Sequence, residues 1–198
     1  MKGKKIAILM AVIALVSFGY KFTIAILAAS LVLIIAAIPT FLVFICKALY
    51  ARHMDQTKAQ KKSAYFKMTI ATTCVVAIFV LFSILKVGNI DITPTNTFDG
   101  WISYVFIAFI ILMFCLSIIN LKGALNKDDL VIIGIKEITF VSALADAVMI
   151  YEFLYRALFK HLNLPFFNMV SNYFPLAIGV LMVLVPINMF KRYFSYEA

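Results

Sequence analysis

The chain has 198 residues, of which 65% are hydrophobic and only 14% are charged, and its mean hydropathy is +1.05. An ordinary soluble domain is about 45–50% apolar and about 25% charged, so polar side chains cannot cover the exterior of this chain. The composition excludes a soluble enzyme, a disordered chain, a collagen and a disulfide scaffold. It predicts an all-α, polytopic transmembrane helical bundle that forms one membrane-embedded domain over residues 1–198.

The net charge is +9, a balance that in a soluble protein would indicate nucleic acid as a partner. Here the Lys and Arg residues lie mainly in short connections between apolar runs, where they set the orientation of a membrane protein. We therefore expect the lipid bilayer to surround the chain, and no nucleic-acid partner. The three cysteines stand singly in apolar runs, which predicts reduced packing residues.

Six apolar runs are candidates for helices that cross a hydrocarbon core of about 30 Å. In chain order, the predicted spans are residues 6–20, 22–46, 66–85, 101–121, 130–158 and 173–190. The first run is short, and its Lys-rich start is also typical of a signal peptide. Because a second run follows Lys21 directly, we expect a retained span that ends in a tight turn at residues 19–21. The alternative is five spans with an interfacial first helix.

The distribution of basic residues predicts the topology. Most Lys and Arg residues fall before the first span, in the connection 47–67, between the fourth and fifth spans, and after the last span. Short loops with such an excess stay in the cytoplasm. We expect a multi-pass protein of a bacterial inner (plasma) membrane with both termini cytoplasmic.

The last part of the chain contains two prolines and an aromatic stretch. Residues 159–172 are amphipathic, which predicts a segment that lies flat at the outer interface before the last span. Pro175 is then expected in the first turn of that span and Pro186 near its end, where proline costs little.

The fifth predicted span is the only one with several ionisable groups. At 100° per residue, the side chains of Thr139, Ser142, Asp146, Glu152 and Arg156 fall on one face of the helix. Charged groups at membrane depth point into the bundle, toward a partner or into a water-filled cavity. These five residues are therefore the candidates for an ion or substrate pathway.

The three charges of this face differ in their local partners. Glu152 and Arg156 are spaced i,i+4 and can neutralise each other. Asp146 has no partner within one turn, although a central carboxylate costs about 2.5–3.5 kcal/mol to insert. It must be protonated or paired with another helix. One interpretation is an ion- or proton-responsive carboxylate, and the other is a structural Asp in a buried network with Asn120, Asn188 or a backbone carbonyl.

The segment Tyr151-Glu152-Phe153-Leu154-Tyr155-Arg156-Ala157-Leu158-Phe159 resembles the EExxxR helix of the CAAX-processing intramembrane protease family. In that family the first glutamate is the catalytic base, a small glycine usually follows, and histidines lie on later helices. Here the first position is Tyr151, the glycine is Ala157, and no histidine follows His161. The resemblance therefore implies at most a degenerate relative of these proteases.

Other chemical motifs are missing from the sequence. The two histidines, His53 and His161, fall on opposite sides of the predicted membrane, and there is no Gly-rich phosphate loop and no Ser/His/Asp arrangement. We therefore expect no catalytic residues, no metal site and no cofactor.

Two classes of function stay open. The first is a small transporter or channel-type subunit with a polar pathway along residues 130–158. In size, layout and the Ala7-x-x-x-Ala11 spacing, the chain is similar to the substrate-binding subunits of energy-coupling-factor transporters. The second is a non-transporting accessory, regulatory or immunity-type subunit, which binds another membrane protein or a second copy of itself.

Overall fold

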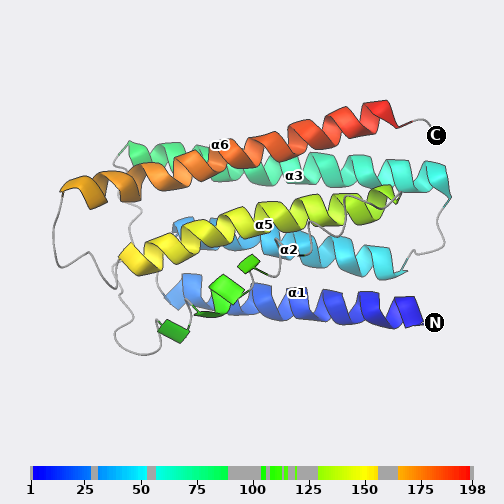
Figure 1. Cartoon of the computed structure of the whole chain (residues 1–198), viewed down its shortest axis with the longest axis horizontal. Coiled ribbons are helices and arrows are strands. Elements are labelled where there is room, and N and C mark those ends of the chain that lie inside the picture. Colours follow the sequence, from blue (N-terminus) through cyan, green and yellow to red (C-terminus); the bar gives the residue numbers. More distant parts are fainter. Residues whose placement is uncertain are drawn as a thin grey trace.

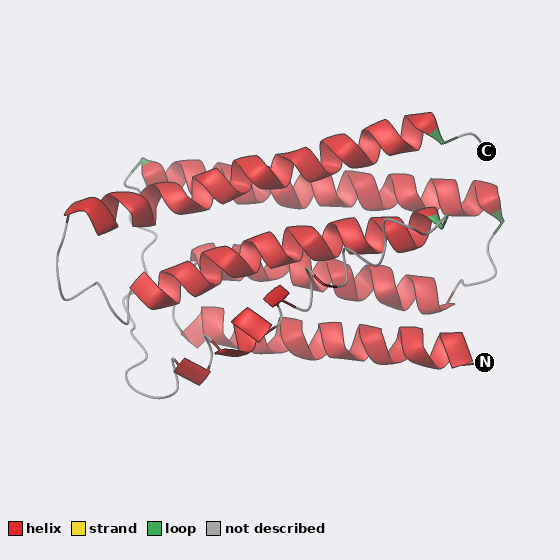
Figure 2. Cartoon of the chain, in the orientation of Figure 1, coloured by secondary structure: helices red, strands yellow, loops and turns green. Residues whose placement is uncertain are grey.

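The computed structural model describes residues 2–27, 31–52, 57–88, 129–155 and 165–196, with short helical pieces between residues 104 and 119. In this part of the chain the regular structure is helical, without strands (Figure 2). The long helices are α1 (Lys2–Leu27), α2 (Leu31–Arg52), α3 (Lys58–Val87), α5 (Leu130–Leu154) and α6 (Pro165–Ser195). The predicted all-helical bundle is confirmed.

The long helices lie side by side along the longest axis of the molecule (Figure 1). The starts of α1, α3 and α5 and the ends of α2 and α6 lie at the same end of the bundle, together with both chain termini. Helix α5 contacts α2, α3 and α6, whereas α1 packs chiefly against α2. Most side chains of α5 are buried, so it is the central element of the bundle.

The outer faces of the helices are apolar. On α1, Ile8, Leu9 and Val16 are exposed, and on α6 so are Val180 and Leu184. By length and composition, four helices of the described chain can cross a membrane. Their segments are Ala7–Leu27, Leu33–Ala51, Lys58–Val87 and Asn172–Ser195. The protein is therefore a membrane-embedded helical bundle, because such faces are stable only against lipid.

The predicted turn at residues 19–21 is wrong. Helix α1 is continuous from Lys2 to Leu27, and α2 begins at Leu31, not at residue 22. Gly19 lies inside the helix, where a Cβ would meet open space. Lys21 is buried in the bundle with only 1% of its surface exposed. A charge inside an apolar run indicates a loop only when that charge has no buried partner.

Helices α2 and α3 extend into the predicted connection 47–67. Helix α2 ends at Arg52, and α3 begins at Lys58. Thr57 caps α3 reciprocally: its hydroxyl accepts from the amide of Gln60 at 3.4 Å, and its own amide donates to the Gln60 side chain at 3.0 Å. This capping box satisfies amides that would otherwise have no partner, so the helix begins well before the apolar run does.

Helix α6 begins earlier than the predicted span 173–190. Residues 165–172 belong to α6 and not to a separate interfacial segment, and residues 159–164 lie outside the described part of the chain. Pro175 and Pro186 both lie inside the helix. The prediction that Pro175 occupies the first turn is therefore wrong.

Most of the predicted span 101–121 lies outside the described residues. Among its described positions, Phe109 packs edge-on against Tyr20 of α1, with ring centroids 4.5 Å apart, and Ile110 is fully buried. Helix α3 ends at one end of the bundle and α5 begins at the other (Figure 1). The bounds of this span stay a prediction.

Candidate functional site

All the acidic residues of the described chain belong to α5 or to its N-cap. Each carboxylate forms an ion pair with a basic residue from another helix. The pairs are Asp129–Lys61, Glu137–Arg192, Asp146–Lys21 and Glu152–Lys86. The basic partners come from α1, α3 and α6, so ion pairs join the central helix to three others.

The most deeply buried pair joins α1 to α5. The Nζ atom of Lys21 lies 2.5 Å from Oδ1 of Asp146, and their side chains are 1% and 2% exposed. Lys21 also donates a hydrogen bond of 2.9 Å to the hydroxyl of Thr40, which is 2.7 Å from the hydroxyl of Ser142. We call Lys21, Thr40, Ser142 and Asp146 the buried cluster.

Three helices position the buried cluster. Ser142 and Asp146 are four residues apart and therefore share one face of α5. Thr40 lies on α2, directly after Pro39, and is 4% exposed. Because α1 packs chiefly on α2, the long side chain of Lys21 is the polar link from α1 to α5. The sequence predicts that Asp146 is either protonated or paired with another helix, and in the structure it is paired with Lys21 of α1.

Glu137 is the centre of a second polar group, which sequence reasoning missed. Its Oε1 atom accepts from Asn188 at 2.9 Å and from Arg192 at 2.7 Å, and its Oε2 atom accepts from the hydroxyl of Tyr65 at 2.8 Å. Tyr65 belongs to α3, and the other two donors belong to α6. The available signal was the i,i+4 spacing of Asn188 and Arg192, which places an amide and a guanidinium on one face of α6.

A glycine on α5 makes room for Tyr65. A Cβ atom built on Gly134 would lie 2.9 Å from Cδ2 of the Tyr65 ring and 3.1 Å from Sδ of Met68. Because Gly134 has no side chain, the ring can lie against α5 and bring its hydroxyl to Glu137. The glycine and the carboxylate are three residues apart, on neighbouring positions of the same helix.

Of the remaining predicted site residues, Thr139 and Glu152 do not join the buried cluster. Glu152 pairs with Lys86 of α3, and both side chains are almost fully buried. Its predicted neighbour Arg156 lies outside the described residues. The hydroxyl of Thr139 donates to the backbone carbonyl of Ile135 at 2.7 Å. The single polar face predicted for this helix is therefore divided between different helix contacts.

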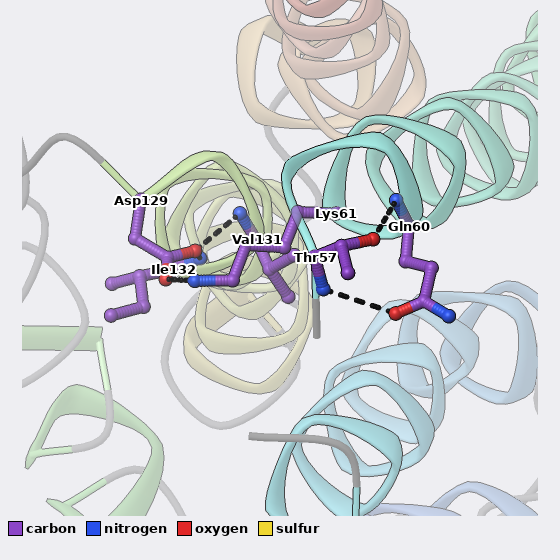
Figure 3. Close-up of polar contacts among 6 residues, drawn as sticks. All are labelled: Thr57, Gln60, Lys61, Asp129, Val131 and Ile132. Atoms are coloured by element: carbon purple, nitrogen blue, oxygen red, sulfur yellow. Dashed lines mark hydrogen bonds and ion pairs between the residues drawn. The ribbon is translucent and has the colours of Figure 1, made fainter. Parts of the chain in front are cut away.

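Asp129 forms a partly exposed ion pair at the start of α5, and its side chain also caps this helix (Figure 3). Oδ1 of Asp129 accepts from the amides of Val131 at 3.0 Å and Ile132 at 3.4 Å, and Oδ2 lies 2.6 Å from Nζ of Lys61. The side chains of Lys61 and Asp129 are 27% and 20% exposed. This pair differs from the buried cluster in its contact with water.

The described residues do not assemble the site of a CAAX-type protease. The carboxylate of Glu152 is engaged by Lys86, and the ring of Tyr151 packs against Phe174 with centroids 4.5 Å apart. His53 and His161 lie outside the described residues. Within the residues that are described, no group of three or more His, Cys, Asp and Glu side chains could hold a metal ion.

What the site can do chemically follows from its charges. The attraction between Lys21 and Asp146 is strong because little water screens it. A proton or a competing cation that neutralises Asp146 would leave Lys21 buried without its counter-charge.

No protein family, curated protein or solved structure gives a significant match to this chain.

Proposed function

We propose that this protein is a small transporter or channel-type membrane subunit whose ion- or proton-responsive element is the buried cluster. The observation that carries the proposal is the Lys21–Asp146 pair, which is 1% and 2% exposed where α1 and α2 meet α5. Ionisable groups at membrane depth mark ion and proton pathways more often than packing positions.

The energetic argument concerns what a buried ion pair contributes. Removing two charges from water costs several kcal/mol per ion, and well-packed apolar residues of similar volume are often as stable or more stable. The pair is therefore a weak means of holding α1 against α5. Its advantage is that a proton can switch it, because neutralising Asp146 removes the attraction that keeps Lys21 in place.

The six-span topology is part of this proposal. Ion pairing neutralises the three acidic residues of α5, Glu137, Asp146 and Glu152, which supports α5 as a fifth span besides the four apolar helices. Helices α3 and α5 run in the same direction (Figure 1). The chain between Val87 and Leu130 therefore has to return to the other end of the bundle, and this return supports a sixth span. Both termini then lie on the cytoplasmic side of a bacterial inner membrane, as the basic connections predict.

A second candidate is a non-transporting accessory or regulatory subunit that binds another membrane protein. The observation that favours it is the division of the polar groups among separate contacts of α5 with α1, α3 and α6. Each carboxylate already has a partner within the chain. In this alternative the ion pairs select the correct helix neighbours, and the exposed apolar face of α1 is available to the partner.

The test measures flux in proteoliposomes with an imposed proton or alkali-cation gradient. The variant Lys21→Met/Asp146→Leu removes both charges of the buried pair together, so that neither ion is left unpaired. The matched control is Asp129→Asn, which changes a partly exposed pair and preserves the N-cap. We expect flux from the wild type and the control, and loss of flux from the folded double variant.

Two outcomes would contradict the transport proposal. Equal flux from the double variant and the wild type would show that the buried cluster is not on the pathway. A wild type without flux in any gradient, which retains a defined membrane-protein partner during purification and loses it in the double variant, would favour the accessory subunit.

A further inference from the structure

A groove between α5 and α6 combines a polar end with apolar walls. It encloses about 480 Å³. At one end it is lined by Lys136, Glu137, Asn188 and Arg192. The rest of the lining is apolar and includes Phe140, Leu144, Leu181 and Leu184. We call this feature the α5–α6 groove.

The groove has about the length of one lipid leaflet. Arg192 lies near the end of α6, and Leu181 lies eleven residues earlier. At a rise of 1.5 Å per residue this is about 16 Å along the helix, close to half of a hydrocarbon core of about 30 Å. Leu181 and Leu184 are 49% and 59% exposed, so the groove opens toward the surrounding lipid.

The charge at the polar end favours an anion. Glu137 is compensated from within the protein by Tyr65, Asn188 and Arg192. Arg192 donates a hydrogen bond from Nη1 to Glu137, and its side chain is 30% exposed. Lys136 adds a second positive charge to the lining. The lining thus contains two basic side chains, Lys136 and Arg192, and one acidic side chain, Glu137.

We propose that the α5–α6 groove binds one anionic glycerophospholipid. The phosphate contacts Lys136 and Arg192, and an acyl chain follows Phe140, Leu144 and Leu181. Basic pockets between membrane helices recognise anionic headgroups in this way, and a guanidinium fits a phosphate bidentately. The polar end lies at the end of the bundle with both termini, the predicted cytoplasmic leaflet. This site does not depend on transport through the buried cluster.

The first test uses native mass spectrometry of the full chain in detergent, titrated with phosphatidylglycerol or with phosphatidylcholine of the same acyl chains. We expect one tightly retained phosphatidylglycerol and weaker retention of phosphatidylcholine. Lys136→Gln should weaken phosphatidylglycerol binding about fivefold. The matched control is Lys191→Gln, an equal change of charge at an exposed neighbour of Arg192 outside the groove, and it should change binding less than twofold.

A second pair of variants tests the apolar part of the site without changing charge. Leu181→Trp fills the groove and should expel the lipid, whereas Val180→Trp, at an exposed position outside the lining, should not. Equal effects of Lys136→Gln and Lys191→Gln would overturn the proposal, because they would indicate a diffuse lipid shell. Equal retention of both lipids would also overturn it, as would a lipid-free dimer that Leu181→Trp disrupts.

Discussion

Lys21 lies on α1 and Asp146 on α5, and their side chains meet where almost no surface of either is exposed. The pair connects two helices that otherwise make few contacts, because α1 packs chiefly on α2. Among the ion pairs of the described residues it is the one least exposed to water, and it links α1 to the central helix α5.

The first prediction concerns this pair. Asp146→Asn leaves the Lys21 cation buried without a counter-charge and should destabilise the protein by about 3–5 kcal/mol. Lys21→Met/Asp146→Leu should recover most of that loss, because no charge stays uncompensated. The measurement is reversible unfolding in mixed micelles for the wild type, Asp146→Asn and the double variant. A double variant as unstable as Asp146→Asn would show that the pair contributes through its shape and not through its charge.

The second prediction concerns Gly134. Gly134→Ala places a methyl group against the Tyr65 ring, which must move away from α5, and overpacking of this kind costs about 1–3 kcal/mol. The displaced hydroxyl should also lose its bond to Glu137. Gly19→Ala is the control, because a Cβ at Gly19 meets nothing within 4 Å and alanine favours the helix by up to about 1 kcal/mol. Thermal unfolding that shows the same loss for both variants would contradict this account.

The third prediction concerns Tyr65 itself. Tyr65→Phe removes the donor to Oε2 of Glu137 but keeps the ring, so a buried carboxylate oxygen loses its hydrogen bond. The expected cost is about 1–3 kcal/mol in the free energy of unfolding. Tyr173→Phe is a suitable control, because Tyr173 is 53% exposed. If the two variants unfold alike, the bond to Glu137 contributes nothing to stability.

The fourth prediction separates the two roles of Asp129. Asp129→Ala removes both the N-cap and the ion pair with Lys61 and should cost about 1–2 kcal/mol. Asp129→Asn keeps the cap and should cost less than about 1 kcal/mol, because a partly exposed pair contributes little. The unfolding of both variants at low and high salt measures the two contributions. Equal losses would assign the whole effect to the ion pair.

The fifth prediction concerns topology. Because both termini lie at the same end of the bundle (Figure 1), reporter domains fused to either terminus should face the same side of the membrane. The basic connections predict that this side is the cytoplasm. Alkaline phosphatase and fluorescent-protein fusions at each end provide the measurement. Reporters on opposite sides would exclude the six-span topology.

Sequence reasoning succeeded where the signal is local. Hydropathy predicts the helical bundle because a long apolar run can be recognised from its own residues, without knowing which helices pack against it. The same reasoning identified Asp146 as a group that could not face lipid. It also predicted that Asp146 would need either a proton or another helix, because no partner lies within one turn of it.

The errors concern partners that are distant in the chain. Lys21 was assigned to a turn because a cation in an apolar run normally marks a loop, and nothing near it in sequence indicates Asp146. Glu137 was overlooked because its three donors come from α3 and α6. Such pairings depend on which helices become neighbours. The spacing of residues within one helix does not determine this arrangement.

The concentration of acidic residues on α5 has a consequence for how the chain is made. Helix α5 is not among the four helices that can cross a membrane by length and composition, and each uncompensated charge would add about 2.5–3.5 kcal/mol to its insertion. Lys21, Lys61 and Lys86 all leave the ribosome before it does. The order of synthesis therefore makes the basic partners of α5 on α1 and α3 available before α5 itself, so that its carboxylates can be neutralised as the bundle assembles.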